Sequence, residues 1–185
     1  MEFWASPEPT VARVDVHEVR DQLAETGHDR RSGDAALIAA LGVSASRAPV
    51  LWERVAPSDP HARDFSEPRR RLNALRHVGV EPIVTLLHHG SGPRDTGLLD
   101  PAFPERFADY AEATARRFPW VRRWTPINEP LTTARFATLY GVWYPNARDD
   151  AAFGRAMFNQ TAAQQAAMRR IRAIIPGAQF VLTDD

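Results

Sequence analysis

The sequence predicts an α/β protein made of repeated strand–helix units, and three observations point to a (β/α)8 barrel. Short apolar runs alternate with longer segments of helical periodicity along the 185 residues. The clearest apolar runs end in polar residues, where a barrel carries its catalytic groups. No glycine-rich dinucleotide-binding motif follows the first run, which disfavours the doubly wound sheet that shares the same alternation.

Five strands are predicted. The first covers residues 2–5 and is followed by a polar, irregular stretch to about Gly33. The clearest strand covers residues 82–88, because it is continuously apolar and then turns polar, as a buried parallel strand does. The other three strands are predicted at residues 43–51, 121–128 and 180–182.

Four helices are predicted between these strands, and each has a recognisable start or stop signal. Asp34 caps the first helix and Gly42 ends it, whereas Gly79 stops the second. Pro104 begins the third helix, and the pair Pro176-Gly177 closes the fourth. The predicted ranges are 34–41, 67–77, 104–118 and 153–175.

The number of units bears on domain organisation. Units of about 40 residues would need roughly 350 residues to make eight, which lies within the range of known barrels. We therefore expect residues 1–185 to be a single domain holding the first four to five βα units, the N-terminal half of a longer barrel.

Composition excludes several classes of function. The 23 basic and 23 acidic residues balance, which gives no electrostatic reason to expect a nucleic acid or membrane partner. There is no cysteine and no lysine, so disulfides, thiolate metal sites and Schiff-base chemistry are excluded. No signal peptide or membrane-spanning run is evident, so a cytoplasmic protein is expected. The balanced charge is compatible with a small neutral carbohydrate as substrate.

The polar residues at the predicted strand ends suggest acid/base chemistry on a sugar. Asn128 and Glu129 follow one strand, and His88 and His89 follow another. A carboxylic acid can protonate a departing glycosidic oxygen, and an amide beside it can bind a sugar hydroxyl. Aromatic residues on which sugar rings could stack are Trp52, Trp124, Tyr140, Trp143 and Tyr144.

Each candidate also has a structural explanation. Glu129 could form an ion pair with an arginine, Asn128 could cap the following turn, and His88 could be a core histidine. Arg47 could be structural or could belong to the site, and Trp52 is expected to face the core.

The neighbouring histidines raise a separate question. Adjacent strand residues point to opposite faces, so His89 is expected to face the helical layer if His88 faces the cleft. The same alternation argues against the two histidines holding a metal together. The segment from Gly90 to Pro93 is expected to be a plain turn rather than a phosphate loop, since it contains proline and no lysine.

Three motifs, in this order, resemble glycoside hydrolase family 1. They are R-A-P-V-L-W-E-R-V-A-P from Arg47, V-T-L-L-H ending at His88, and W-T-P-I-N-E-P from Trp124. Members of that family show R-F-S-I-x-W-x-R-I-x-P, V-T-L-x-H and T-x-N-E-P runs. The resemblance extends over nearly the whole chain and implies a β-glucosidase-like TIM barrel.

The resemblance implies a role for each site residue. Glu129 would be the general acid/base of a retaining β-glycosidase, Asn128 would contact the sugar 2-hydroxyl, and His88 would bind another hydroxyl. Arg47 would lie beneath the nucleophile, a glutamate expected at strand seven and therefore absent from these residues. His89 and Trp143 complete the expected sugar-binding set, and this chemistry uses no cofactor or metal.

Two departures from the family pattern affect the sugar-binding site. The usual glutamine of the first strand has no clear counterpart near Pro7-Glu8-Pro9, and His89-Gly90 replaces the usual Trp-Asp. The run from His88 to Pro93 resembles a bacterial family-1-like branch, some members of which are fused to a sugar-nucleotide reductase-like domain. A non-catalytic carbohydrate-binding or regulatory module attached to such an enzyme is therefore the alternative function.

Overall fold

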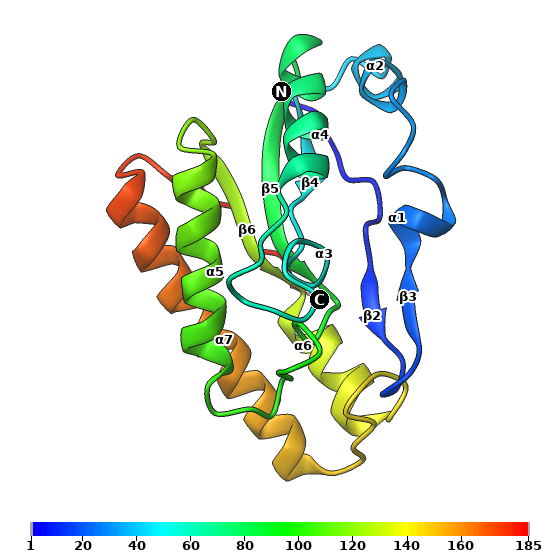
Figure 1. Cartoon of the computed structure of the whole chain (residues 1–185), viewed down its shortest axis with the longest axis vertical. Coiled ribbons are helices and arrows are strands. Elements are labelled where there is room, and N and C mark those ends of the chain that lie inside the picture. Colours follow the sequence, from blue (N-terminus) through cyan, green and yellow to red (C-terminus); the bar gives the residue numbers. More distant parts are fainter. Residues whose placement is uncertain (1, 185) are drawn as a thin grey trace.

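The computed structural model describes residues 2–184 and is organised around a parallel sheet. Five strands lie in the order β1-β4-β5-β6-β7, and each pairs in parallel with its neighbour. Figure 1 shows helices in front of the sheet, with the long last helix beside the preceding one. The strand bounds are β1 Trp4–Ala5, β4 Ala45–Pro49, β5 Glu81–His88, β6 Arg123–Asn128 and β7 Gln179–Phe180.

The four predicted helices are confirmed, with shifts at their ends. They are α2 Asp34–Ala40, α4 Ser66–His77, α5 Phe103–Arg117 and α7 Asp150–Ile174. The last begins three residues earlier than predicted because the Asp149 side chain caps it, accepting from the amide of Ala152. The prediction that Asp34 caps the first helix was wrong: Gly33 holds the cap position, and the Asp34 carboxylate contacts His28 and Arg31.

Several short elements were not predicted. The stretch expected to be irregular contains an antiparallel hairpin of β2 Val11–Arg13 and β3 Val19–Asp21, followed by α1 Gln22–Glu25. Strands of three residues show too little alternation to be recognised in a sequence. The other short elements are α3 Trp52–Val55, α6 Pro130–Ala134 and a π-helical turn, η1 Arg135–Leu139.

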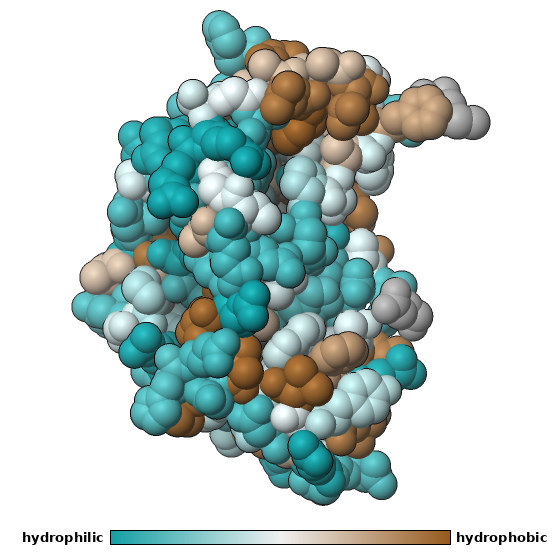
Figure 2. Space-filling view, turned by 90° about the vertical axis from the view of Figure 1, so that its right-hand side faces the viewer, coloured by the Kyte–Doolittle hydropathy of each residue, from teal (hydrophilic) through white to brown (hydrophobic). Residues whose placement is uncertain are grey.

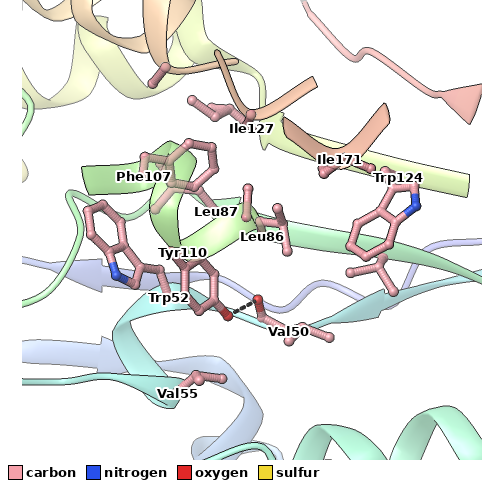
Figure 3. Packing of buried hydrophobic residues seen from close by; sticks show 14 of the residues in the cluster. Val50, Trp52, Val55, Leu86, Leu87, Phe107, Tyr110, Trp124, Ile127 and Ile171 are labelled. Atoms are coloured by element: carbon pink, nitrogen blue, oxygen red, sulfur yellow. Dashed lines mark hydrogen bonds between the residues drawn. The ribbon is translucent and has the colours of Figure 1, made fainter. Parts of the chain in front are cut away.

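An aromatic cluster joins the end of β4 to α5. Trp52 lies 5.7–5.9 Å, centroid to centroid, from the rings of Phe103, Phe107 and Tyr110. Figure 3 shows the Tyr110 hydroxyl reaching the carbonyl of Val50, to which it donates at 2.7 Å. Because these side chains are buried, the cluster fixes the chain just after the strand to the helix that covers it.

Two tryptophans thereby leave the set of sugar-stacking candidates. Trp52 is core-facing, as expected, and Trp124 is completely buried, with its indole N–H donating to the carbonyl of Val121.

Figure 2 shows apolar side chains gathered at the upper end of the molecule, the end at which α2 lies in Figure 1. Among the described residues, no helix is both long and apolar enough to cross a membrane.

Replacing Tyr110 with phenylalanine tests the cluster. Tyr110→Phe leaves the Val50 carbonyl without its buried donor, and we expect the free energy of unfolding to fall by about 1–2 kcal/mol. Urea unfolding followed by circular dichroism measures the change. The matched control is Tyr140→Phe at an exposed position, where the change should stay within about 0.5 kcal/mol. Equal effects at both positions would contradict the assigned role.

Candidate active site

The site begins where β5 and β6 end side by side. The two strands run in parallel, and His88 is the register partner of Asn128. The next residue, Glu129, has left-handed backbone angles of φ 44° and ψ 66° and caps α6, which starts at Pro130. A non-glycine residue in this region costs about 1–2 kcal/mol, so the surrounding contacts must hold it. Because of this bend, the Glu129 side chain does not follow the alternating directions of side chains along an extended strand.

The hydrogen bonds around Asn128 form one chain. The amide N–H of Glu129 donates to Thr183 Oγ1 at 3.3 Å, and the Thr183 hydroxyl donates to Asn128 Oδ1 at 3.0 Å. Asn128 Nδ2 is therefore directed as a donor toward His89 Nε2, 3.4 Å away. His89 accepts this bond in the tautomer whose Nδ1–H donates to Thr133 Oγ1 at 3.0 Å. We assign that tautomer, which turns the Nε2 lone pair of His89 toward the site.

Glu8 is a site residue that the sequence did not reveal. Its carboxylate lies 2.9 Å from His88 Nε2, although 80 positions separate the two residues in the chain. His88 is 2% exposed, whereas the Glu8 side chain is 56% exposed and so faces solvent. The hydrogen bond from His88, helped by one from Thr10, lowers the pKa of Glu8 to about 2 against the opposing effect of burial. Glu8 is thus a permanent negative charge in the site.

The prediction that His89 faces away from His88 was wrong. His89 has a φ of 56°, so the alternation of an extended strand ends at His88. Its ring stands perpendicular to that of His88, with a centroid distance of 4.8 Å. Its Nε2 atom lies 3.7 Å from Glu129 Oε2. Both imidazoles therefore lie in one cluster with the carboxylates of Glu8 and Glu129.

Trp143 and Arg47 border this group in different ways. Trp143 packs against the ring of His89 at 5.4 Å and against Phe136 at 4.8 Å, so it forms an aromatic wall. The Arg47 side chain donates through Nε to Thr85 Oγ1 at 3.3 Å. Burial lowers the pKa of Arg47, and its attraction to the carboxylates of Glu8 and Glu129 opposes that effect. Its Nη2 is buried without a hydrogen-bond partner among the described residues.

The turn after His89 rests on Glu53 and Arg13. Glu53 Oε1 accepts the amide of Gly92 at 2.9 Å, and the guanidinium of Arg13 donates to Ser91 and to the carbonyls of Gly92 and Thr96. A side chain at Gly90 would place its Cβ 1.8 Å from Glu53 Oε1. The segment is therefore a plain turn, as expected, with one of its amides already bonded to a carboxylate.

The structure brings together most of the residues that the sequence singled out. His88, His89, Asn128 and Glu129 meet at one edge of the sheet, with Trp143 beside them. Sequence reasoning missed Glu8, Thr133, Thr183 and Arg13, and it assigned no role to Glu53, which follows the second predicted strand. The one signal for Glu8 in the sequence was that no glutamine stands near Pro7-Glu8-Pro9, where the family pattern expects one.

Comparisons with known proteins agree with this arrangement. The family model "Glycosyl hydrolase family 1" matches residues 9–183. Beta-glucosidase A of Thermotoga maritima is 27% identical over 184 residues, covering 95% of this chain and 41% of its own length. Mouse Klotho is 34% identical over 123 residues, covering 62% of this chain and 12% of its own.

A solved structure shows the same fold. The T. maritima beta-glucosidase in complex with cyclophellitol matches with a TM-score of 0.76 and 27% identity. The match covers 84% of this chain and 37% of that one. It confirms the predicted barrel class, of which the chain carries a part. The chain thus spans less than half the length of each of these relatives.

The buried Glu53 should make stability depend on pH. Burial raises the pKa of Glu53 from 4.5 to about 7, and its Oε2 has no partner among the described residues. The folded protein therefore keeps a proton on Glu53 that the unfolded chain releases above about pH 4.5. This contribution to stability is fully present below about pH 4.5 and is lost as pH rises through about 7. The loss should reach about 3 kcal/mol. Glu53→Gln should remove this component, as measured by urea unfolding at pH 5 and pH 8. An unchanged pH dependence in the variant would refute the assignment.

Proposed function

Because this chain belongs to glycosyl hydrolase family 1, we propose that it supplies the acid/base half of a retaining β-glycosidase active site. The observation that carries the proposal is the Glu129 carboxylate at the end of β6, next to an amide and two imidazoles. Its side chain is 28% exposed, which leaves it accessible to a substrate in the cleft.

The reaction is a double displacement with two carboxyl groups. A glutamate nucleophile, expected at strand seven and so outside these 185 residues, attacks the anomeric carbon. As the bond to the leaving oxygen breaks, Glu129 transfers its proton to that oxygen. Glu129 then removes a proton from water, and the water oxygen displaces the nucleophile from the anomeric carbon. Retention predicts about 5–5.5 Å between the two carboxyl groups, and the chemistry needs no cofactor or metal.

The other site residues fit a small glycoside substrate. Asn128 Nδ2 donates to His89 Nε2 and is placed to meet the 2-hydroxyl when a sugar displaces this imidazole contact. His88 and the Glu8 carboxylate offer a donor and an acceptor for further hydroxyls. Trp143 provides an apolar surface against which a sugar ring can stack.

Arg47 is placed to compensate the site's negative charge. Its guanidinium interacts with the carboxylates of Glu8 and Glu129, and its buried Nη2 has a free donor in the described part of the chain. In the proposed mechanism this donor faces the carboxylate of the nucleophile. A fused downstream domain and a cytoplasmic location remain predictions.

Replacing Glu129 tests the acid role. In the full-length protein that contains these residues, Glu129→Gln should lower kcat/KM for alkyl glycosides by about 10²–10⁴-fold. Activated aryl glycosides should lose much less, because their leaving groups depart without a proton. Glu105→Gln, on the surface of α5, is the matched control and should behave as wild type. Equal losses on both substrate types would contradict the acid role, whereas no hydrolysis by the wild-type protein would favour the alternative of a non-catalytic carbohydrate-binding module.

A second prediction concerns the activity of the 185-residue chain alone. It should hydrolyse neither alkyl nor activated aryl glycosides, because the nucleophile is proposed to lie on a later strand. Release of an aryl leaving group, followed by absorbance with the purified chain, measures this. Turnover that disappears in Glu129→Gln would show that the nucleophile is already present within these residues.

A further inference from the structure

We infer that Glu8, His88 and His89 form a binding site for one late first-row divalent metal ion, with Zn²⁺ as the representative. Each residue offers one ligand atom, and these atoms all lie within 4.8 Å of one another. Among the described residues, this is the one group of three or more such side chains with that spacing. The inference goes beyond the proposed hydrolysis, which uses no metal.

The distances suit a small ion after minor side-chain adjustment. Tetrahedral Zn²⁺ holds nitrogen and oxygen ligands at about 2.0–2.2 Å, which separates neighbouring ligand atoms by about 3.3 Å. Glu8 Oε1 and His88 Nε2 are 2.9 Å apart, close to that separation. Glu129 Oε2 lies 3.7 Å from His89 Nε2 and is placed to serve as a fourth ligand or to bond a metal-bound water.

The side chains are already oriented for coordination. The bond between His89 Nδ1 and Thr133 Oγ1 directs the Nε2 lone pair of His89 into the cluster, the support typical of metal-bound histidines. His88 is almost fully buried, so its ring is fixed. To bind the ion through Nε2 it must take the tautomer whose proton lies on Nδ1, in place of the Nε2 proton that it now shares with Glu8. The Asn128 amide, which now donates to His89 Nε2 and lies 3.2 Å from His88 Nε2, gives way to the ion.

The donor set selects the kind of ion. Two imidazole nitrogens and one carboxylate suit Zn²⁺, Ni²⁺ or Cu²⁺, whereas Mg²⁺ and Ca²⁺ prefer oxygen ligands alone. The negative charge of Glu8 offsets part of the ion's charge. An ion here occupies the place that the proposed function gives to the sugar hydroxyls. Sugar and ion therefore exclude each other, and Zn²⁺ acts as an inhibitor if the proposed function holds.

Titration of the 185-residue chain with Zn²⁺ tests the site without any need for hydrolysis. Isothermal titration calorimetry in a non-chelating buffer should show one high-affinity ion per chain and no comparable binding of Mg²⁺. Glu8→Gln and His89→Asn should each weaken Zn²⁺ binding at least about ten-fold. Asparagine is chosen at position 89 because it tolerates the positive φ found there. Circular dichroism checks that both variants remain folded.

The matched control is a second histidine–carboxylate pair. His28 Nδ1 lies 2.5 Å from Asp34, so His28→Asn removes a comparable group elsewhere on the chain. This variant should bind Zn²⁺ like wild type. Wild-type affinity in both Glu8→Gln and His89→Asn, or loss of binding in His28→Asn, would overturn the inference. Absorption of bound Co²⁺ gives a second readout, since its visible bands should disappear in the two cluster variants. Failure of these tests leaves the Glu129 experiment unaffected.

Discussion

The parallel register of β5 with β6 is the constraint on which the site depends. It sets His88 level with Asn128, so the last residues of two strands that are 40 positions apart in sequence meet at one edge. β1 leads into Glu8, which reaches this edge from one side, and Thr183 pairs with Asn128 from the other. A slip of one residue would turn the alternate side chains of β6 toward the cleft and remove Asn128 from its partners.

Two residues with left-handed backbone angles then bring side chains from the ends of two strands into one cluster. His89 and Glu129 each follow a strand end with positive φ, and their side chains turn toward each other. Local contacts offset the conformational free energy that the positive φ of these two residues costs. Glu53 and Arg13 hold the turn after His89, while a hydrogen bond to Thr183 and the start of α6 hold Glu129. Strain of this kind is typical of functional sites, where the surroundings enforce a conformation that the residue alone would avoid.

Much of this arrangement could be predicted from the sequence, and the failures have physical causes. Strands and helices were recognisable because their apolar periodicity is long, and Asn128 with Glu129 stood out as polar residues after a buried strand. His89 was misplaced because the alternation rule assumes extended backbone. Glu8 was missed because its partner lies far along the chain, and the hairpin because its strands are too short. Trp124 carried no sequence signal that separated the core from the cleft.

The close approach of Glu53 to Gly90 also has an evolutionary consequence. The volume that a Cβ at position 90 would need is filled by a carboxylate oxygen from α3. The two positions are therefore epistatic: a larger residue at 90 is tolerated only in a background where position 53 has become smaller or has moved. Moving the Glu53 carboxylate aside would break the hydrogen bond that it accepts from the amide of Gly92, so a change at position 90 also weakens the support of the segment that follows it.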